Sequence, residues 1–156
     1  TEIQKGRLFC WLEYTIHPFW RIGPLKAEFL SIHPVEIVQY HKIFSDSCVE
    51  NLKELASSQL LPSTTVLDDD ETVNSEDVTT RLSSTVWMPD DSSKATKHVS
   101  EIIETITGLK VKGNAAEELQ ITAYTPGGHY ALHLDSAGFD ENAPVNRVAT
   151  FMIYDF

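Results

Sequence analysis

The most informative stretch of this chain joins an expected strand to a glycine turn and a polar pair: Tyr124-Thr125-Pro126-Gly127-Gly128-His129-Tyr130-Ala131-Leu132-His133-Leu134-Asp135. Residues 120–124 alternate polar and apolar side chains like a half-buried strand, and the Pro-Gly-Gly turn ends it. A second strand is expected to begin there, so His133 and Asp135 would point to the same side of it. An imidazole and a carboxylate placed in this way supply two of the three ligands of a non-haem Fe(II) site.

The chain resembles the catalytic domain of collagen-type prolyl 4-hydroxylase alpha subunits, which are Fe(II)/2-oxoglutarate-dependent dioxygenases. The resemblance rests on residues 124–135 together with Asn146-Arg147-Val148-Ala149-Thr150 on the next expected strand. Residues 7–10, 24–26, 44–46 and 106–109 and the region of Trp87 also follow the order found in that family. Nearly the whole chain is therefore covered, and an ordered set of this kind is more specific than any single motif.

The resemblance implies a role for five residues. His133 and Asp135 would bind the metal, and Tyr124 would hydrogen-bond 2-oxoglutarate. Tyr130 would lie beside the substrate proline, and Arg147 would face the groove that holds the peptide. These two residues are the predicted catalytic pair.

His129 leaves two interpretations open. His129 lies an even number of positions before both His133 and Asp135, so a continuous strand would bring all three side chains to one face. A bend at Gly127 and Gly128 would spoil that register, and the resembled family takes its second histidine from a distant strand. We therefore interpret His129 as a polar residue at the rim of the pocket, with a third metal ligand as the alternative.

The resemblance implies the activity of a procollagen-proline 4-dioxygenase, which hydroxylates peptidyl proline at C4. Its cofactors and cosubstrates would be Fe(II), 2-oxoglutarate, O2 and L-ascorbate. Its substrate would be a proline-rich, procollagen-like peptide, its partner a disulfide-isomerase subunit, and its location the lumen of the endoplasmic reticulum. Two alternatives stay open: a related hydroxylase that acts on lysine or another protein, and a non-catalytic isoform that acts as an assembly or interaction module.

The order of the expected elements indicates an α+β fold. Strands are expected at residues 35–40, 120–124 and 147–154, and helices at residues 45–58 and from about Asp91 to Gly108. The resemblance sharpens this to a partial jelly-roll core, with residues 1–33 as an N-terminal arm packed on a catalytic domain at 34–156. In that family further strands follow and carry the second histidine and a basic residue for 2-oxoglutarate. We therefore expect an incomplete domain and an inactive isolated chain.

Composition narrows the classes of partner. The formal net charge of −11 argues against nucleic acid, and no apolar run is long enough to span a membrane. The two cysteines, Cys10 and Cys48, do not form a disulfide framework, although the resemblance places Cys10 where the family has a disulfide cysteine. The acidic stretch at 63–84 predicts a solvated loop, and a lid over a peptide is the functional alternative.

Overall fold

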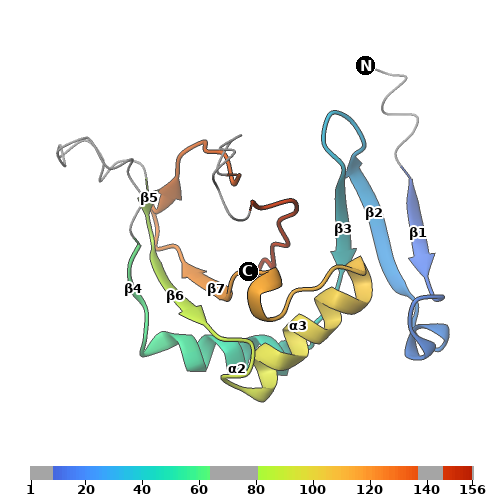
Figure 1. Ribbon diagram of the computed structural model, residues 1–156, viewed down its shortest axis with the longest axis horizontal. Coiled ribbons are helices and arrows are strands. Elements are labelled where there is room, and N and C mark those ends of the chain that lie inside the picture. Colours follow the sequence, from blue (N-terminus) through green and yellow to red (C-terminus); the bar gives the residue numbers. More distant parts are fainter. Residues whose placement is uncertain (1–8, 64–80, 137–145, 156) are drawn as a thin grey trace.

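The computed structural model describes residues 9–63, 81–136 and 146–155. They combine two helices with small antiparallel sheets, so the predicted α+β class is confirmed. Two three-stranded sheets stand above the helices α2 and α3, with the C-terminal segment between them (Figure 1). Closure of strands into a jelly roll stays a prediction.

The first sheet has the order β1-β2-β3, from β1 (Cys10–Glu13), β2 (Leu25–Ser31) and β3 (Ile37–His41). The strand expected at residues 35–40 is thus present, shifted slightly along the chain. Leu25 and Ala27 of β2 are buried, and a short 3-10 helix, η1 (Pro18–Arg21), lies between β1 and β2. The predicted domain boundary at residue 33 falls in the connection between two paired strands, and the division into an arm and a domain stays a prediction.

Both predicted helices form, and their ends follow from local capping. Ser45 accepts a hydrogen bond from the backbone N–H of Cys48 at the start of α2 (Asp46–Ser57). Helix α3 (Lys94–Thr107) begins three residues later than expected, because Ser93 and Thr96 cap it reciprocally. Gly108 ends α3 with a φ of 69°, a left-handed conformation that glycine adopts without steric cost.

The second sheet has the order β4-β6-β7, from β4 (Leu61–Pro62), β6 (Ser84–Met88) and β7 (Leu119–Ala123). Strand β7 confirms the strand expected at residues 120–124, and the 3-10 helix η3 (Gly113–Ala115) precedes it. Two short strands, β5 (Arg81–Leu82) and β8 (His129–Tyr130), pair separately. Most of the acidic stretch at 63–84 lies outside the described residues, but its last residues belong to β5 and β6 rather than to a loop.

The strand expected at residues 147–154 is wrong, since the described residues 146–155 form no strand. A strand needs a neighbouring backbone, and within the described ranges none pairs with this segment. Side chains hold it instead: Arg147 binds Glu117, and Asp155 lies 3.0 Å from Lys53 Nζ of α2. Polar side-chain contacts therefore attach this segment to elements that are distant in the sequence.

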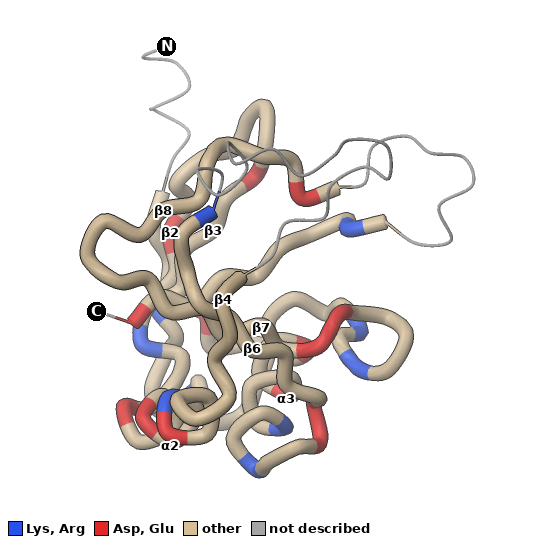
Figure 2. The backbone as a smooth tube through the Cα atoms, turned by 90° about the vertical axis from the view of Figure 1, so that its left-hand side faces the viewer, with Lys and Arg blue, Asp and Glu red and all other residues tan. Residues whose placement is uncertain are grey.

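The buried apolar side chains of the described residues belong to β2, α2, β6 and α3. They are small or medium-sized, namely Leu25, Ala27, Cys48, Ala56, Met88, Val99 and Ile106. None of the helices in the described ranges is long and apolar enough to cross a bilayer. Figure 2 shows that the acidic and basic residues lie largely along the helices and the connecting segments.

Candidate metal centre

The glycine turn places the His-x-Asp segment by packing closely on strand β5. Gly127 adopts a φ of +86°, and the N–H of Gly128 donates to the carbonyl of Thr125 at 2.7 Å. A Cβ on Gly128 would lie 2.8 Å from the carbonyl oxygen of Leu82, so this approach requires glycine. The chain then pairs with β5 as β8, and the polar pair follows in residues 131–136, which form no strand.

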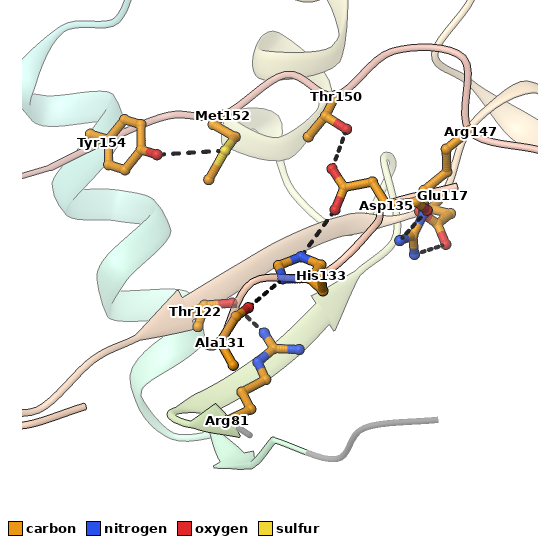
Figure 3. A network of polar contacts seen from close by, with 10 residues as sticks. All are labelled: Arg81, Glu117, Thr122, Ala131, His133, Asp135, Arg147, Thr150, Met152 and Tyr154. Carbon is orange, nitrogen blue, oxygen red and sulfur yellow. Dashed lines mark hydrogen bonds and ion pairs between the residues drawn. The ribbon is translucent and has the colours of Figure 1, made fainter. Parts of the chain in front are cut away.

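His133 and Asp135 converge although the expected strand does not continue through them. His133 Nε2 lies 3.1 Å from Asp135 Oδ1 (Figure 3). His133 Nδ1 lies 2.8 Å from the carbonyl oxygen of Ala131, which can only accept a hydrogen bond. Nδ1 therefore carries the proton of this bond, and Nε2 is the nitrogen that faces the carboxylate.

The second oxygen of Asp135 is fixed by a residue of the C-terminal segment. Thr150 Oγ1 donates to Asp135 Oδ2 at 2.6 Å. This bond lowers the pKa of the Asp135 carboxyl, and the positive charges of His133 and Arg147 lower it further, while partial burial opposes them. Asp135 is thus held as a carboxylate with Oδ1 turned toward His133.

The spacing of the pair suits two ligands of one cation. The contact at 3.1 Å is an ion pair when His133 carries a proton on Nε2, and a cation between the two groups can take the place of that proton. Two ligands bound at right angles, each about 2.1 Å from an ion, lie about 3 Å apart. The observed separation therefore fits two adjacent positions of an octahedral metal.

The pair offers two of the three protein ligands that the sequence led us to expect. Across the described ranges, no group of three His, Cys, Asp or Glu side chains is arranged to hold a metal ion. His129 belongs to β8 and is exposed, four residues before His133, so the local triad finds no support there. His41 instead lies 2.6 Å from Glu28 in the first sheet. His129 stays a predicted residue of the pocket rim.

Tyr130 lies directly against His133. Its ring stacks on the His133 imidazole with a centroid separation of 3.7 Å and an interplanar angle of 18°. The guanidinium of Arg81 covers the ring of Tyr130 at 4.6 Å from its centroid. Tyr124 follows the end of β7 and is half-exposed, and within the described ranges no hydrogen bond or ring contact joins it to the pair. Its predicted role with 2-oxoglutarate therefore stays a prediction.

Arg147 is engaged on two sides. Its Nε and Nη2 atoms donate to the two carboxylate oxygens of Glu117 at 2.7 and 2.6 Å, and Nη1 donates to the carbonyl of Asp135 at 3.1 Å. The Glu117 hydrogen bonds raise the pKa of Arg147, so the guanidinium stays charged. In this arrangement Arg147 ties the C-terminal segment to the His-x-Asp segment, and its predicted contact with a peptide stays a prediction.

Three residues of the site received no role from the sequence: Thr150, Glu117 and Arg81. Thr150 stood in the motif that carried the resemblance, but its partner Asp135 lies fifteen residues away in the sequence. Glu117 and Arg81 belong to charged stretches that are typical of solvated surfaces. Only the folded chain brings these side chains to the site.

Comparison with known proteins supports the same family. No family model matches the chain. The chain is 33% identical over 156 residues to prolyl 4-hydroxylase subunit alpha-2 of Caenorhabditis elegans, covering 96% of this chain and 28% of that protein. It is 33% identical over 161 residues to subunit alpha-1 of Gallus gallus, covering 99% of this chain and 30% of the relative. With subunit alpha-3 of Homo sapiens the identity is 32% over 160 residues, covering 99% and 28%.

These matches span nearly all of this chain but less than a third of the length of each relative. They include the His-x-Asp pair, the glycine turn and the residues that hold Asp135, because they leave at most a few residues of the chain uncovered. Over this segment, the chain belongs to the family of prolyl 4-hydroxylase alpha subunits.

Proposed function

We propose that this chain carries the metal-binding part of an enzyme that hydroxylates peptidyl proline at C4, with Fe(II), 2-oxoglutarate and O2 as cofactor and cosubstrates and L-ascorbate as reductant. The observation that carries the proposal is the convergence of His133 Nε2 and Asp135 Oδ1 at 3.1 Å, with the other polar atom of each side chain hydrogen-bonded to Ala131 and Thr150. The names of the relatives support the reaction, and the donor set of imidazole and carboxylate suits Fe(II).

The residues of the chain would prepare this site in three ways. Ala131 selects the tautomer of His133 that leaves Nε2 available, and Thr150 turns one oxygen of Asp135 toward it. Arg147 holds the backbone between the two segments, with Glu117 as its anchor. Bound Fe(II) with 2-oxoglutarate supplies the oxidising power that O2 alone lacks for attack on a C–H bond.

The substrate and the surroundings of the enzyme are part of the proposal. A proline-rich, procollagen-like peptide is the proposed substrate, in keeping with the names of the relatives. A disulfide-isomerase subunit is the proposed partner, and the lumen of the endoplasmic reticulum the proposed location. Both follow from the family resemblance alone.

A metal titration tests the site without relying on turnover. Co(II), whose absorption reports imidazole and carboxylate ligation, is titrated into the 156-residue chain and three variants. His133→Ala and Asp135→Ala should each weaken binding at least about tenfold, because each removes one of two ligands. His129→Ala is the matched control and should bind within about twofold of the unchanged chain. Loss of binding in His129→Ala equal to that in His133→Ala would instead establish the local triad.

Turnover gives the second test. Two protein ligands hold an ion weakly, so we expect the 156-residue chain to release no peptide-dependent labelled CO2 from 2-oxoglutarate with Fe(II), ascorbate and a proline-rich peptide. Asp135→Ala provides the baseline. Turnover clearly above that baseline would contradict the expectation and show that the chain completes its own site.

The two-ligand site also favours a second candidate, a non-catalytic module for assembly or interaction. The two are separated by the same titration. If the unchanged chain binds Co(II) no better than Asp135→Ala does, His133 and Asp135 do not form a metal site. The second candidate, a non-catalytic module, would then replace the first.

A further inference from the structure

Helices α2 and α3 lie against one another beneath the sheets (Figure 1), and a cavity of about 480 Å³ opens between them. Its volume lies in the range of sites for small molecules. One wall is a face of α2 and its C-terminal end, where Asn51, Glu54, Leu55 and Ser58 follow one another at helical spacing. The other wall is the start of α3 around Lys94. The cavity is therefore built from elements other than the His-x-Asp segment.

Each wall of this cavity carries one charged side chain. Glu54 lies in the last turn of α2, and Lys94 is the first residue of α3. Neither forms an ion pair with the other or with another residue of the described ranges, whereas Lys53, Lys97 and Lys112 each pair with a carboxylate there. The cavity thus presents a carboxylate on one wall and an ammonium on the other, and both are available to a ligand.

The position of each charge is unfavourable for its own helix. The amino end of a helix carries a partial positive charge and the carboxyl end a partial negative one, so Lys94 and Glu54 each meet a charge of their own sign. The first turn of α3 has no acidic residue and the last turn of α2 has no basic residue that would compensate. Residues that break a local rule in this way are typical of functional sites.

We propose that this cavity binds a small zwitterion with an aliphatic side chain, the chemistry of a free α-amino acid. Such a molecule carries an ammonium for Glu54 and a carboxylate for Lys94, and each contact would be a charge-assisted hydrogen bond. A simple anion would meet the carboxylate of Glu54 in a chain whose net charge is −11, and a simple cation would meet the ammonium of Lys94. Leu55, which is 37% exposed, and Ala95 offer apolar surface for the side chain.

Two side-chain amides stand on the same wall as Glu54. The side chain of Asn51 makes no hydrogen bond within the described ranges, and Gln59 uses its amide nitrogen to donate to the carbonyl of Leu55 at 2.8 Å. An ammonium has three N–H groups and no acceptor, so one carboxylate does not satisfy it. Amide oxygens beside the Glu54 carboxylate supply the further acceptors that a bound ammonium needs.

L-Leucine is the probe, and two of its derivatives isolate the two charges. The ¹⁵N-labelled 156-residue chain is titrated at low salt with EDTA present, and the backbone amide resonances of Lys94 and Ala95 report binding. They should shift with L-leucine and saturate. N-acetyl-L-leucine lacks the ammonium and L-leucinamide lacks the carboxylate, so each should bind about tenfold more weakly or worse.

Four variants test the assignment of the two charged residues. Glu54→Gln and Lys94→Gln should each weaken L-leucine binding about tenfold, because each removes one charge from a charge-assisted bond. Glu36→Gln and Lys110→Gln are the matched controls, because both residues are exposed, lie outside the lining of the cavity and change the net charge equally. They should bind L-leucine within about twofold of the unchanged chain.

The structural alternative is that Glu54 and Lys94 only attract one another across the cavity and hold α2 on α3. Urea unfolding separates the two readings. Because each charge opposes the dipole of its own helix, Glu54→Gln and Lys94→Gln should be at least as stable as the unchanged chain. Lower stability of both variants together with no L-leucine binding would establish the structural role and overturn the proposal.

Three further results would overturn it: resonances that do not shift with L-leucine, derivatives that bind as tightly as L-leucine, or binding that Glu54→Gln and Lys94→Gln leave intact. The titration contains no metal, and neither residue belongs to the His-x-Asp segment. Its outcome is therefore independent of the Co(II) titration that tests the proposed function.

Discussion

Replacing Gly128 with alanine should damage the site through backbone contacts that no side-chain movement can relieve. The new Cβ would lie 2.8 Å from both Leu82 O and Thr125 O, and 3.2 Å from Thr125 N. Real Cβ atoms do not approach backbone oxygens this closely, so either β8 must move away from β5 or the turn must open. We expect a loss of roughly 1–3 kcal/mol in the free energy of unfolding, the usual cost of an overpacked position.

Two other glycines separate this contact from a general effect of adding a methyl group. At Gly127 nothing lies within 4 Å, but φ is +86°, so Gly127→Ala should cost roughly 1–2 kcal/mol through backbone strain alone. At Gly23 there is open space and no positive φ. Gly23→Ala should be neutral or stabilising by up to about 1 kcal/mol, because alanine restricts the unfolded chain.

Urea unfolding followed by tryptophan fluorescence measures all three variants, and Co(II) titration measures the site. Displacement of β8 would carry Tyr130 off His133, so Gly128→Ala should also weaken Co(II) binding, whereas Gly23→Ala should not. A Gly128→Ala protein as stable as Gly23→Ala would refute the reasoning, since the close approach would then not exist in solution.

Three further predictions concern polar contacts. Thr150→Val should weaken Co(II) binding about tenfold, because it removes the hydroxyl that orients Asp135. Thr150→Ser keeps the hydroxyl and should bind Co(II) like the unchanged chain. Equal Co(II) affinities of the valine and serine variants would contradict this role. The coupling energy between Arg147 and Glu117, measured by a double-mutant cycle with glutamine at each position, should stay below about 1 kcal/mol, because both side chains are about half exposed to solvent. A larger coupling energy would show that water screens this ion pair less than its exposure implies. The pKa of Glu28 is lowered from 4.5, chiefly by its hydrogen bond with His41, so its stabilisation should be present above pH 4.5 and be lost as the pH falls through the folded value. The urea midpoints of Glu28→Gln and the unchanged chain should therefore differ at neutral pH and converge in acid, and a gap that persists in acid would count against it.

Features that depend on neighbouring residues could be predicted from the sequence. Ser45 and Gly108 end helices through contacts within a few residues, and both assignments are confirmed. Residues 147–154 show why strands are harder. Their composition suits a strand, but a strand forms only where another backbone pairs with it, and the sequence of one segment does not contain that partner.

His133 and Asp135 do lie in contact, but not for the reason expected from the sequence, and their role as metal ligands stays a prediction. Alternation along a strand was expected to bring His133 and Asp135 together, yet neither residue lies in a strand. Their geometry comes from Ala131, which fixes one ring nitrogen, and from Thr150, which fixes one carboxylate oxygen. The spacing of two residues permits the contact, and hydrogen bonds from outside the pair select it.

The stability of the site and that of the fold are therefore separable. The buried side chains lie in β2, the helices and the end of β6, whereas Asp135 is held by hydrogen bonds from the exposed residues Thr150 and Arg147. In the same segment, Leu132 and Leu134 are 106% and 84% exposed, so apolar packing of these neighbours does not support the pair. Exposed hydrogen bonds contribute little to global stability, but a metal site tolerates little displacement of its ligands. A change that releases residues 146–155 should thus reduce metal affinity well before it unfolds the chain.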